Sequence, residues 1–326
     1  MRLLSLALAG ISALAAAAPA TAAWHQAKSA HFIIYSDEKP ARLTEFASRL
    51  ERFDRAARAL LSMDDPAVGD GNRVTVYVFP TVKDVQKLAG DSFLSGFYSG
   101  RVSGPLAYVA KRDDDSDLGA QTILYHEYAH HLMMQQLDQP YPEWYVEGFA
   151  EFLSTPSFGK DGSVGIGAPP QHRAWGLFNG DQLALDSLLG GTYGDMTKLK
   201  PELRESIYGR GWLLVHYLTM EPKRSGQLTK YVLGIAKGVA PLKSAQDSFG
   251  DLKLLDKDLN TYLHRSTVKS FSVGMRRTAG DRRPAAEYRR GGRRAVARED
   301  QIRPEEPGRR TGPDPGTSAR GEISRR

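Results

Sequence analysis

The sequence predicts an α+β fold, in which a mixed α/β N-terminal part is followed by a helical C-terminal half. Two observations lead to this prediction. Between residues 31 and 110, short apolar runs alternate with segments whose apolar residues recur every three or four positions. Beyond this region the helical period predominates. We therefore expect one folded domain over residues 23–270 of the 326-residue chain.

The first elements follow from local patterns of apolar residues. The runs HFIIYS (31–36) and RVTVYVF (73–79) predict strands. Between them, apolar residues at helical spacing predict a helix from Pro40 to Met63.

Caps and glycines indicate how the chain continues. Thr81 is a suitable N-cap for a helix that Gly90 would close. The Gly- and Ser-rich segment 95–110 predicts turns that lead into a strand near residues 106–110.

Two further helices are predicted in the middle of the chain. The first has a possible cap at Ser116 or Asp117 and ends before DQPYP (138–142). The second is PEWYVEGFAEFLS, with Pro142 in its first turn. After it, the Gly- and Pro-rich segment 156–176 is expected to form a strand pair and the rim of a cleft.

Three of the eight histidines fall within six residues, inside LYHEYAHHLMM (124–134). His126 and His130 are four apart, so they lie on one face of a helix. Glu127 completes the pattern H-E-x-x-H, in which two imidazoles bind one zinc ion and the glutamate acts on the metal-bound water. His131 points roughly 100° away from His130 and is expected to be a packing or rim residue.

A zinc site of this kind needs a third protein ligand and one open position. In the next helix, Glu147 and Glu151 are again four apart and share a face. We expect Glu147 to be the third ligand and Glu151 to accept a hydrogen bond from a ligand imidazole. The alternative is that both glutamates belong to a solvated stripe.

The segments HEYAHHL and PEWYVEGFAEFLS together resemble the gluzincin metallopeptidases. They most resemble the peptidase-MA-like group of secreted bacterial proteins, and more distantly aminopeptidase N and thermolysin. The resemblance implies a zincin-like fold with zinc bound by His126, His130 and Glu147. It also implies that Glu127 is the general base and that Glu151 supports a ligand from behind.

A further match is SIYGRGWLLVHYL (206–218), which is similar to the Y-x-K-G segment of aminopeptidase N. It implies that Tyr208 stabilises the transition state, with Arg210 in the place of the family's lysine. Arg210 can contact substrate or pair with an acid. The family's G-A-M-E-N glutamate, which anchors a free amine, has no counterpart in SGFYSG or SGPLAYVA. An aminopeptidase is therefore not implied, and an endopeptidase or a non-peptide hydrolase stays open.

The sequence thus predicts a zinc-dependent metallopeptidase that holds one zinc ion per chain and acts on a peptide or protein substrate. A catalytically silent zinc-binding module for peptide or cell-wall ligands is the alternative. The remaining histidines are expected to be structural: His25, His31, His172, His216 and His264.

The N-terminal segment differs in composition from the rest. Residues 1–22 combine Arg2, an apolar run and the small-residue pattern Ala20-Thr21-Ala22, which predicts a cleaved signal peptide and export to the periplasm or the extracellular space. A transmembrane helix is the alternative, but the run is short and lacks a charged stop, so no stable membrane span is expected after cleavage. Cysteine is absent, which excludes a disulfide framework.

The C-terminal segment carries the basic charge. Residues 276–326 hold 15 arginines, no lysine and 8 acidic residues, a net charge of +7. Since the whole chain carries +6, the remainder is close to neutral and no nucleic-acid partner is expected. Arg, Gly and Pro dominate residues 271–326, which are therefore predicted to be disordered. An RNA-binding arm and an out-of-frame translation of GC-rich DNA are the alternatives.

Overall fold

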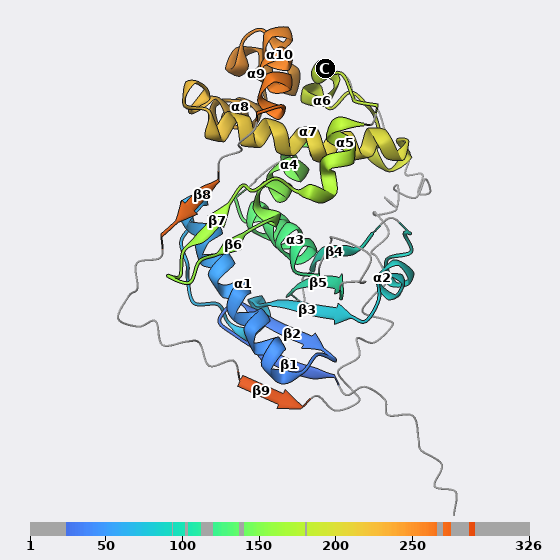
Figure 1. Ribbon diagram of the computed structural model, residues 1–326, viewed down its shortest axis with the longest axis vertical. Helices are drawn as coiled ribbons and strands as arrows, with labels where there is room; N and C mark the ends of the chain where they lie inside the picture. Colours follow the sequence, from blue (N-terminus) through green and yellow to red (C-terminus); the bar gives the residue numbers. More distant parts are fainter. Residues whose placement is uncertain are drawn as a thin grey trace, which may run out of the picture. The chain divides into compact units, whose positions relative to one another are not determined.

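The computed structural model describes residues 24–92, 94–101, 104–111, 120–136, 140–179, 181–265, 270–274 and 287–290. The predicted signal peptide, the predicted cap at Ser116 or Asp117 and most of the Arg-rich segment lie outside these residues. Within them the chain has the predicted α+β organisation, with a mixed sheet followed by a helical half (Figure 1). Among the described helices, none is long and apolar enough to pass through a bilayer.

Six strands form the main sheet, in the order β4-β5-β3-β2-β1-β9. Their bounds are β1 His25–Lys28, β2 Phe32–Ser36, β3 Val74–Phe79, β4 Gly96–Arg101, β5 Gly104–Ala110 and β9 Glu287–Arg290. β2, β3 and β5 are parallel, whereas β1, β4 and β9 run antiparallel to their neighbours. The strands predicted over 31–36, 73–79 and 106–110 are confirmed, and β1 and β9 were not predicted.

The prediction of turns before residue 106 is wrong, because Gly96–Arg101 pairs with β5 as the edge strand β4. Gly96 has a packing role in this strand. A Cβ atom added there would lie 2.3 Å from Cγ2 of Ile123, on the helix α3 (Ala120–Met134). The glycine therefore lets the edge strand lie close against the helix that carries the H-E-x-x-H motif.

Helices cover the sheet, and the helix predicted over residues 40–63 ends two residues earlier, at Leu61. α1 (Pro40–Leu61) packs on β1 and β2, and α3 packs on β4 and β5. In α2 (Val82–Ala89), Thr81 and Asp84 form a capping box, and Gly90 closes the helix with a φ of 70°. Both predicted ends of α2 are confirmed.

The helical half and a small second sheet complete the fold. The helices are α4 Glu143–Ser154, α5 Ala174–Phe178, α6 Leu185–Gly190, α7 Pro201–Met220, α8 Gln227–Ala236, α9 Pro241–Phe249 and α10 Leu252–Leu263. The small sheet consists of β6 Ser157–Phe158, β7 Val164–Ile166 and β8 Phe271–Val273. The strand pair predicted in the 156–176 segment is thus β6–β7. Beyond residue 270, β8 pairs with β7 and β9 pairs with β1.

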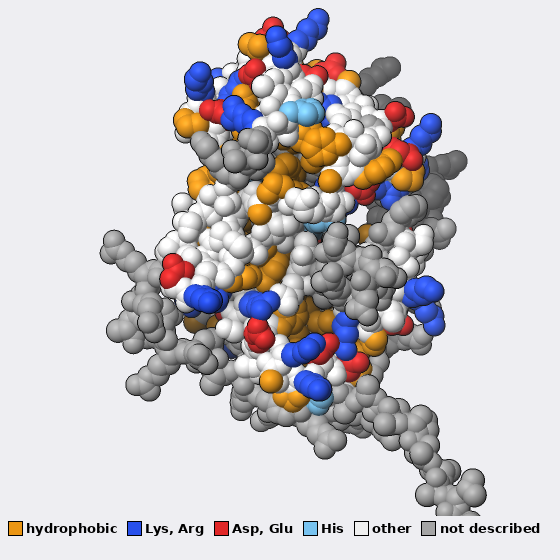
Figure 2. Space-filling view, viewed as in Figure 1, with side chains coloured by type: hydrophobic (Ala, Val, Ile, Leu, Met, Phe, Trp, Pro, Cys, Tyr) orange, Lys and Arg blue, Asp and Glu red, His pale blue; other side chains and the backbone are white. Residues whose placement is uncertain are grey.

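The surface of the described residues carries both signs of charge. On the face drawn in Figure 2, basic and acidic side chains are interspersed. This distribution agrees with the near-neutral balance of the chain before residue 276.

The helices α4 and α7 cross with their backbones in direct contact, and two glycines make this possible. A Cβ added at Gly148 would lie 2.2 Å from the carbonyl carbon of Gly211, and one added at Gly211 would lie 2.5 Å from the backbone oxygen of Trp144. No side chain can move aside there, since the obstructing atoms belong to the backbone. The crossing brings the segment E-G-x-A-E of α4 beside the segment Y-G-R-G of α7.

Gly211→Ala is expected to destabilise the fold. Alanine is favoured over glycine inside a helix by about 1 kcal/mol. Overpacking against backbone atoms outweighs this gain and typically costs about 1–3 kcal/mol. Urea unfolding followed by circular dichroism measures the difference. The matched control is Gly69→Ala, because Gly69 has open space around it and a φ of −69°. Equal stability of Gly211→Ala and the wild type would contradict the proposed reason for the glycine.

Candidate metal centre

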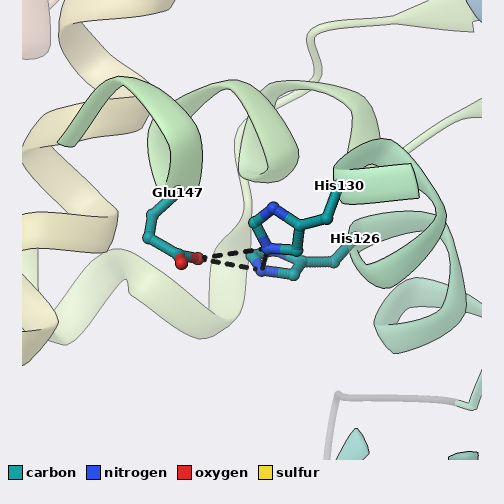
Figure 3. Close-up of side chains that lie close together, drawn as sticks. All are labelled: His126, His130 and Glu147. Atoms are coloured by element: carbon teal, nitrogen blue, oxygen red, sulfur yellow. Dashed lines mark hydrogen bonds and ion pairs between the residues drawn. The ribbon is translucent and has the colours of Figure 1, made fainter. Parts of the chain in front are cut away.

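The three predicted ligand residues come from α3 and α4 and converge (Figure 3). Nε2 of His126 lies 3.1 Å from Nε2 of His130 and 3.1 Å from Oε2 of Glu147. Nε2 of His130 lies 3.5 Å from the same carboxylate oxygen. The four-residue spacing stacks the two imidazoles on one face of α3, and α4 brings the carboxylate up to them.

These separations fit a zinc ion. Tetrahedral zinc sites have bonds of about 2.0–2.1 Å to nitrogen and oxygen, which puts neighbouring ligand atoms roughly 3.3 Å apart. The three observed separations of 3.1, 3.1 and 3.5 Å lie around this value. Two imidazoles and one carboxylate are also the donor set of one class of catalytic zinc sites. His126, His130 and Glu147 could therefore hold the ion with one position left for water or substrate.

The electrostatics of the cluster favour a positive ion. Burial raises the pKa of Glu147, but the neighbouring imidazoles lower it by more, so this carboxyl is held in its ionised form. Burial lowers the pKa of His126, but its hydrogen bonds to Glu147 and Glu151 raise it by more, to about 10. Glu147 and Glu151 thus stabilise the protonated form of His126. A metal ion that binds here would take the place of that proton.

Glu151 lies behind His126, on the side of the ring away from Glu147. Its Oε1 is 3.3 Å from Nδ1 of His126, the nitrogen on the far side of the ring from the ligand cluster. The side chain is only 1% exposed. Burial raises the pKa of Glu151, but the charge of Arg173 and the hydrogen bonds from His126 and His172 lower it far more. A permanent negative charge is therefore held against His126, which fixes the orientation of the ring.

Two residues of this support were not predicted from the sequence. Nε2 of His172 lies 3.0 Å from Oε2 of Glu151, and Arg173 donates to Oε1 of Glu151 at 2.8 Å. Arg173 also donates to both carboxylate oxygens of Glu205 at 3.0 Å. His172 was expected to be one of the scattered structural histidines. His172 has a structural role, because it contacts the carboxylate that lies behind His126.

Glu127 and Tyr208 line one pocket of about 260 Å³ beside His126. Burial raises the pKa of Glu127, and the charges of His126 and His130 offset this only in part. Such a carboxyl is better suited to exchange protons near neutral pH than an exposed glutamate.

Tyr208 stands close to the ligand cluster, at the edge of the same pocket. Its ring centre is 6.1 Å from that of His126, and the guanidinium carbon of Arg173 lies 4.2 Å above its ring. Burial raises the pKa of Tyr208, so the phenol keeps its proton and can act as a hydrogen-bond donor. The packing of α4 against α7 thus brings the tyrosine ring close to His126.

Arg210 and His131 lie apart from the cluster. Arg210 donates to the backbone oxygen of Leu183 and to Asp256, so it pairs with an acid. His131 contacts the Tyr98 hydroxyl through Nδ1 at 2.8 Å and stacks on Tyr128. The prediction that His131 does not join the metal ligands is consistent with this position.

A scan against protein-family models finds no match to this chain, and a search of curated proteins finds no similar sequence. The assignment of a function therefore rests on the geometry of the described residues and on the resemblance of the motifs.

His130→Ala is expected to remove one equivalent of bound zinc, because a ligand is lost and two protein ligands bind zinc much more weakly than three. Elemental analysis after dialysis against zinc measures the change. The matched control is the neighbouring His131→Ala, which should keep the wild-type zinc content. Equal zinc content in His130→Ala and the wild type would contradict the ligand assignment.

Proposed function

We propose that this protein is a zinc-dependent metallopeptidase of the gluzincin type, with a zincin-like domain. One observation carries the proposal: Nε2 of His126, Nε2 of His130 and Oε2 of Glu147 lie within 3.1–3.5 Å of one another. They do so beside a pocket lined by a partly buried carboxylic acid, Glu127, and by Tyr208. The motif resemblance, which names the same five residues, supports the proposal.

The residues have distinct roles in the proposed reaction. When zinc is bound, it lowers the pKa of water to about 7 and polarises a carbonyl group. Glu127 accepts a proton from the attacking water and passes it to the leaving amine. The Tyr208 hydroxyl donates a hydrogen bond to the oxyanion that develops on the scissile carbonyl. Glu151 keeps the His126 ring in the orientation that zinc binding needs.

The edge strand β4 favours cleavage within a chain over cleavage of an N-terminal residue. In the resembling aminopeptidases, a glutamate on this strand anchors the substrate's amine. β4 consists of GFYSGR and has no carboxylate. Glu205 on α7 also lines the pocket, but it forms an ion pair with Arg173. We therefore propose an endopeptidase, exported to the periplasm or the extracellular space, that acts on peptides or proteins.

A digest of a broad peptide library tests the proposed function. The wild-type protein should cleave peptides, lose this activity after removal of metal by a chelator, and regain it on addition of zinc. Mass spectrometry of the products would separate internal cleavage from N-terminal trimming. Peptide binding without cleavage in the zinc-loaded protein would instead indicate the catalytically silent binding module. Products that do not depend on zinc would contradict the proposal.

A further inference from the structure

A second cluster of metal-ligand side chains lies where β2, α1 and α3 meet. His31 precedes β2, and Glu51 and Asp54 stand on α1. Their exposed fractions are 8%, 6% and 1%. Nδ1 of His31 lies 2.8 Å from Oε2 of Glu51 and 3.5 Å from Oδ2 of Asp54. All three donor atoms lie within 4.8 Å of one another, as in the cluster on the other face of α3.

Further hydrogen bonds orient the two carboxylates of this cluster. The backbone N–H of His31 donates to the second oxygen of Glu51 at 2.8 Å. The second oxygen of Asp54 accepts from the Tyr128 hydroxyl at 2.6 Å and from Arg58 at 2.7 Å.

The other ring nitrogen of His31 also has a partner, and this partner determines which of the two nitrogens carries the proton. Nε2 of His31 lies 2.9 Å from a carboxylate oxygen of Asp65. A metal-binding histidine characteristically donates its other N–H to a carboxylate in this way. With the proton on Nε2, the neutral ring presents the lone pair of Nδ1 to two carboxylate oxygens. This arrangement needs a positive partner in the middle.

A proton on Nδ1 of His31 can neutralise only one of the two carboxylate oxygens that face it. It would serve Glu51 at 2.8 Å, but Oδ2 of Asp54 has no hydrogen-bond partner among the described residues, although it is buried. A buried carboxylate oxygen without a partner is costly. A metal ion at the centre would contact all three donor atoms at once.

The charge balance is compatible with a bound cation. The carboxylates of Glu51 and Asp54 are buried, whereas the side chain of Asp65 is 46% exposed. Together they face the positive charge of Arg58. With a neutral His31 and a divalent cation this group of side chains has no net charge.

We propose that His31, Glu51 and Asp54 form a second metal site for a divalent transition-metal cation such as zinc. One imidazole with two carboxylates is a donor set that such ions accept. The site would be structural, because the ion ties the start of β2 to α1 and, through the Tyr128 hydroxyl, to the helix of the first cluster. A pocket of about 430 Å³ lined by His31, Arg58 and Tyr128 gives an ion access from outside.

Zinc counting with variants of the full chain tests the second site. Protein stripped with a chelator is dialysed against zinc and analysed for metal. The wild type should bind two zinc ions, His130→Ala one, and His130→Ala with Glu51→Gln none. Glu45→Gln, an exposed position on the same helix, is the matched control and should leave the count unchanged. One zinc ion in the wild type and none in His130→Ala would overturn the proposal.

Two further outcomes distinguish the second site from misfolding of a variant and from failure of the first site. If Glu51→Gln does not fold, the unfolding temperature of His130→Ala with and without zinc replaces it. A rise on addition of zinc supports the second site, and no change overturns it. If the wild type and His130→Ala both bind one ion and Glu51→Gln binds none, the second site stands and the first cluster fails as a zinc site.

Discussion

Replacement of Glu127 by glutamine is expected to lower the rate of peptide cleavage by at least about 100-fold, the effect typical of losing a general base. The amide is nearly the same size as the acid, and Glu127 is not among the three converging ligand residues. The variant should therefore keep its fold, its zinc and its affinity for peptides. The amide cannot accept a proton from water, so only the chemical step is affected. Single-turnover cleavage of a peptide identified in the library digest measures this rate.

The Glu127 comparison needs two controls. Glu45→Gln makes the same chemical change at an exposed position on α1 and should cleave at the wild-type rate. Zinc content should be equal in all three proteins. If Glu127→Gln gives the same products at the same rate as the wild type, the cleavage does not use this residue, and a contaminating protease becomes the explanation.

Tyr208→Phe is expected to lower the cleavage rate by about 100- to 1000-fold, the usual effect of removing one donor to a developing oxyanion. The phenylalanine ring keeps the stacking under Arg173, whose guanidinium carbon lies 4.2 Å away, so the fold should not change. The loss should appear in kcat, with KM little altered, because the hydrogen bond is made mainly in the transition state.

Tyr125→Phe is the matched control for Tyr208→Phe. Tyr125 precedes His126 on α3, and its hydroxyl is buried without a hydrogen-bond partner among the described residues. Removal of this hydroxyl should leave kcat unchanged. A Tyr208→Phe variant that is as active as Tyr125→Phe would remove Tyr208 from the mechanism, while the zinc assignment would remain.

The parts of the structure that were predictable depend on signals close together in the sequence. Thr81 and Gly90 bound α2 as expected, because a cap acts within one turn. The pairs His126–His130 and Glu147–Glu151 could be placed on shared faces because helical spacing is fixed. The edge strand β4 was missed because its glycines and serines resemble a turn, and its strand conformation comes from pairing with β5.

The residues that could not be predicted are joined only by the tertiary fold. Arg173 lies 22 positions after Glu151, in a segment without a regular period. Only the burial of Glu151, which a sequence does not reveal, shows that a cation must lie beside it. His31 and Asp54 are likewise brought together by the packing of β2 on α1, and no motif links them.

Diffraction from zinc-loaded crystals, recorded on both sides of the zinc absorption edge, tests the central claim most directly. We predict an anomalous peak about 2.0–2.2 Å from Nε2 of His126, Nε2 of His130 and a carboxylate oxygen of Glu147, with Glu127 close by but not bound to it. Zinc-loaded crystals with no anomalous peak between these three residues would contradict the account.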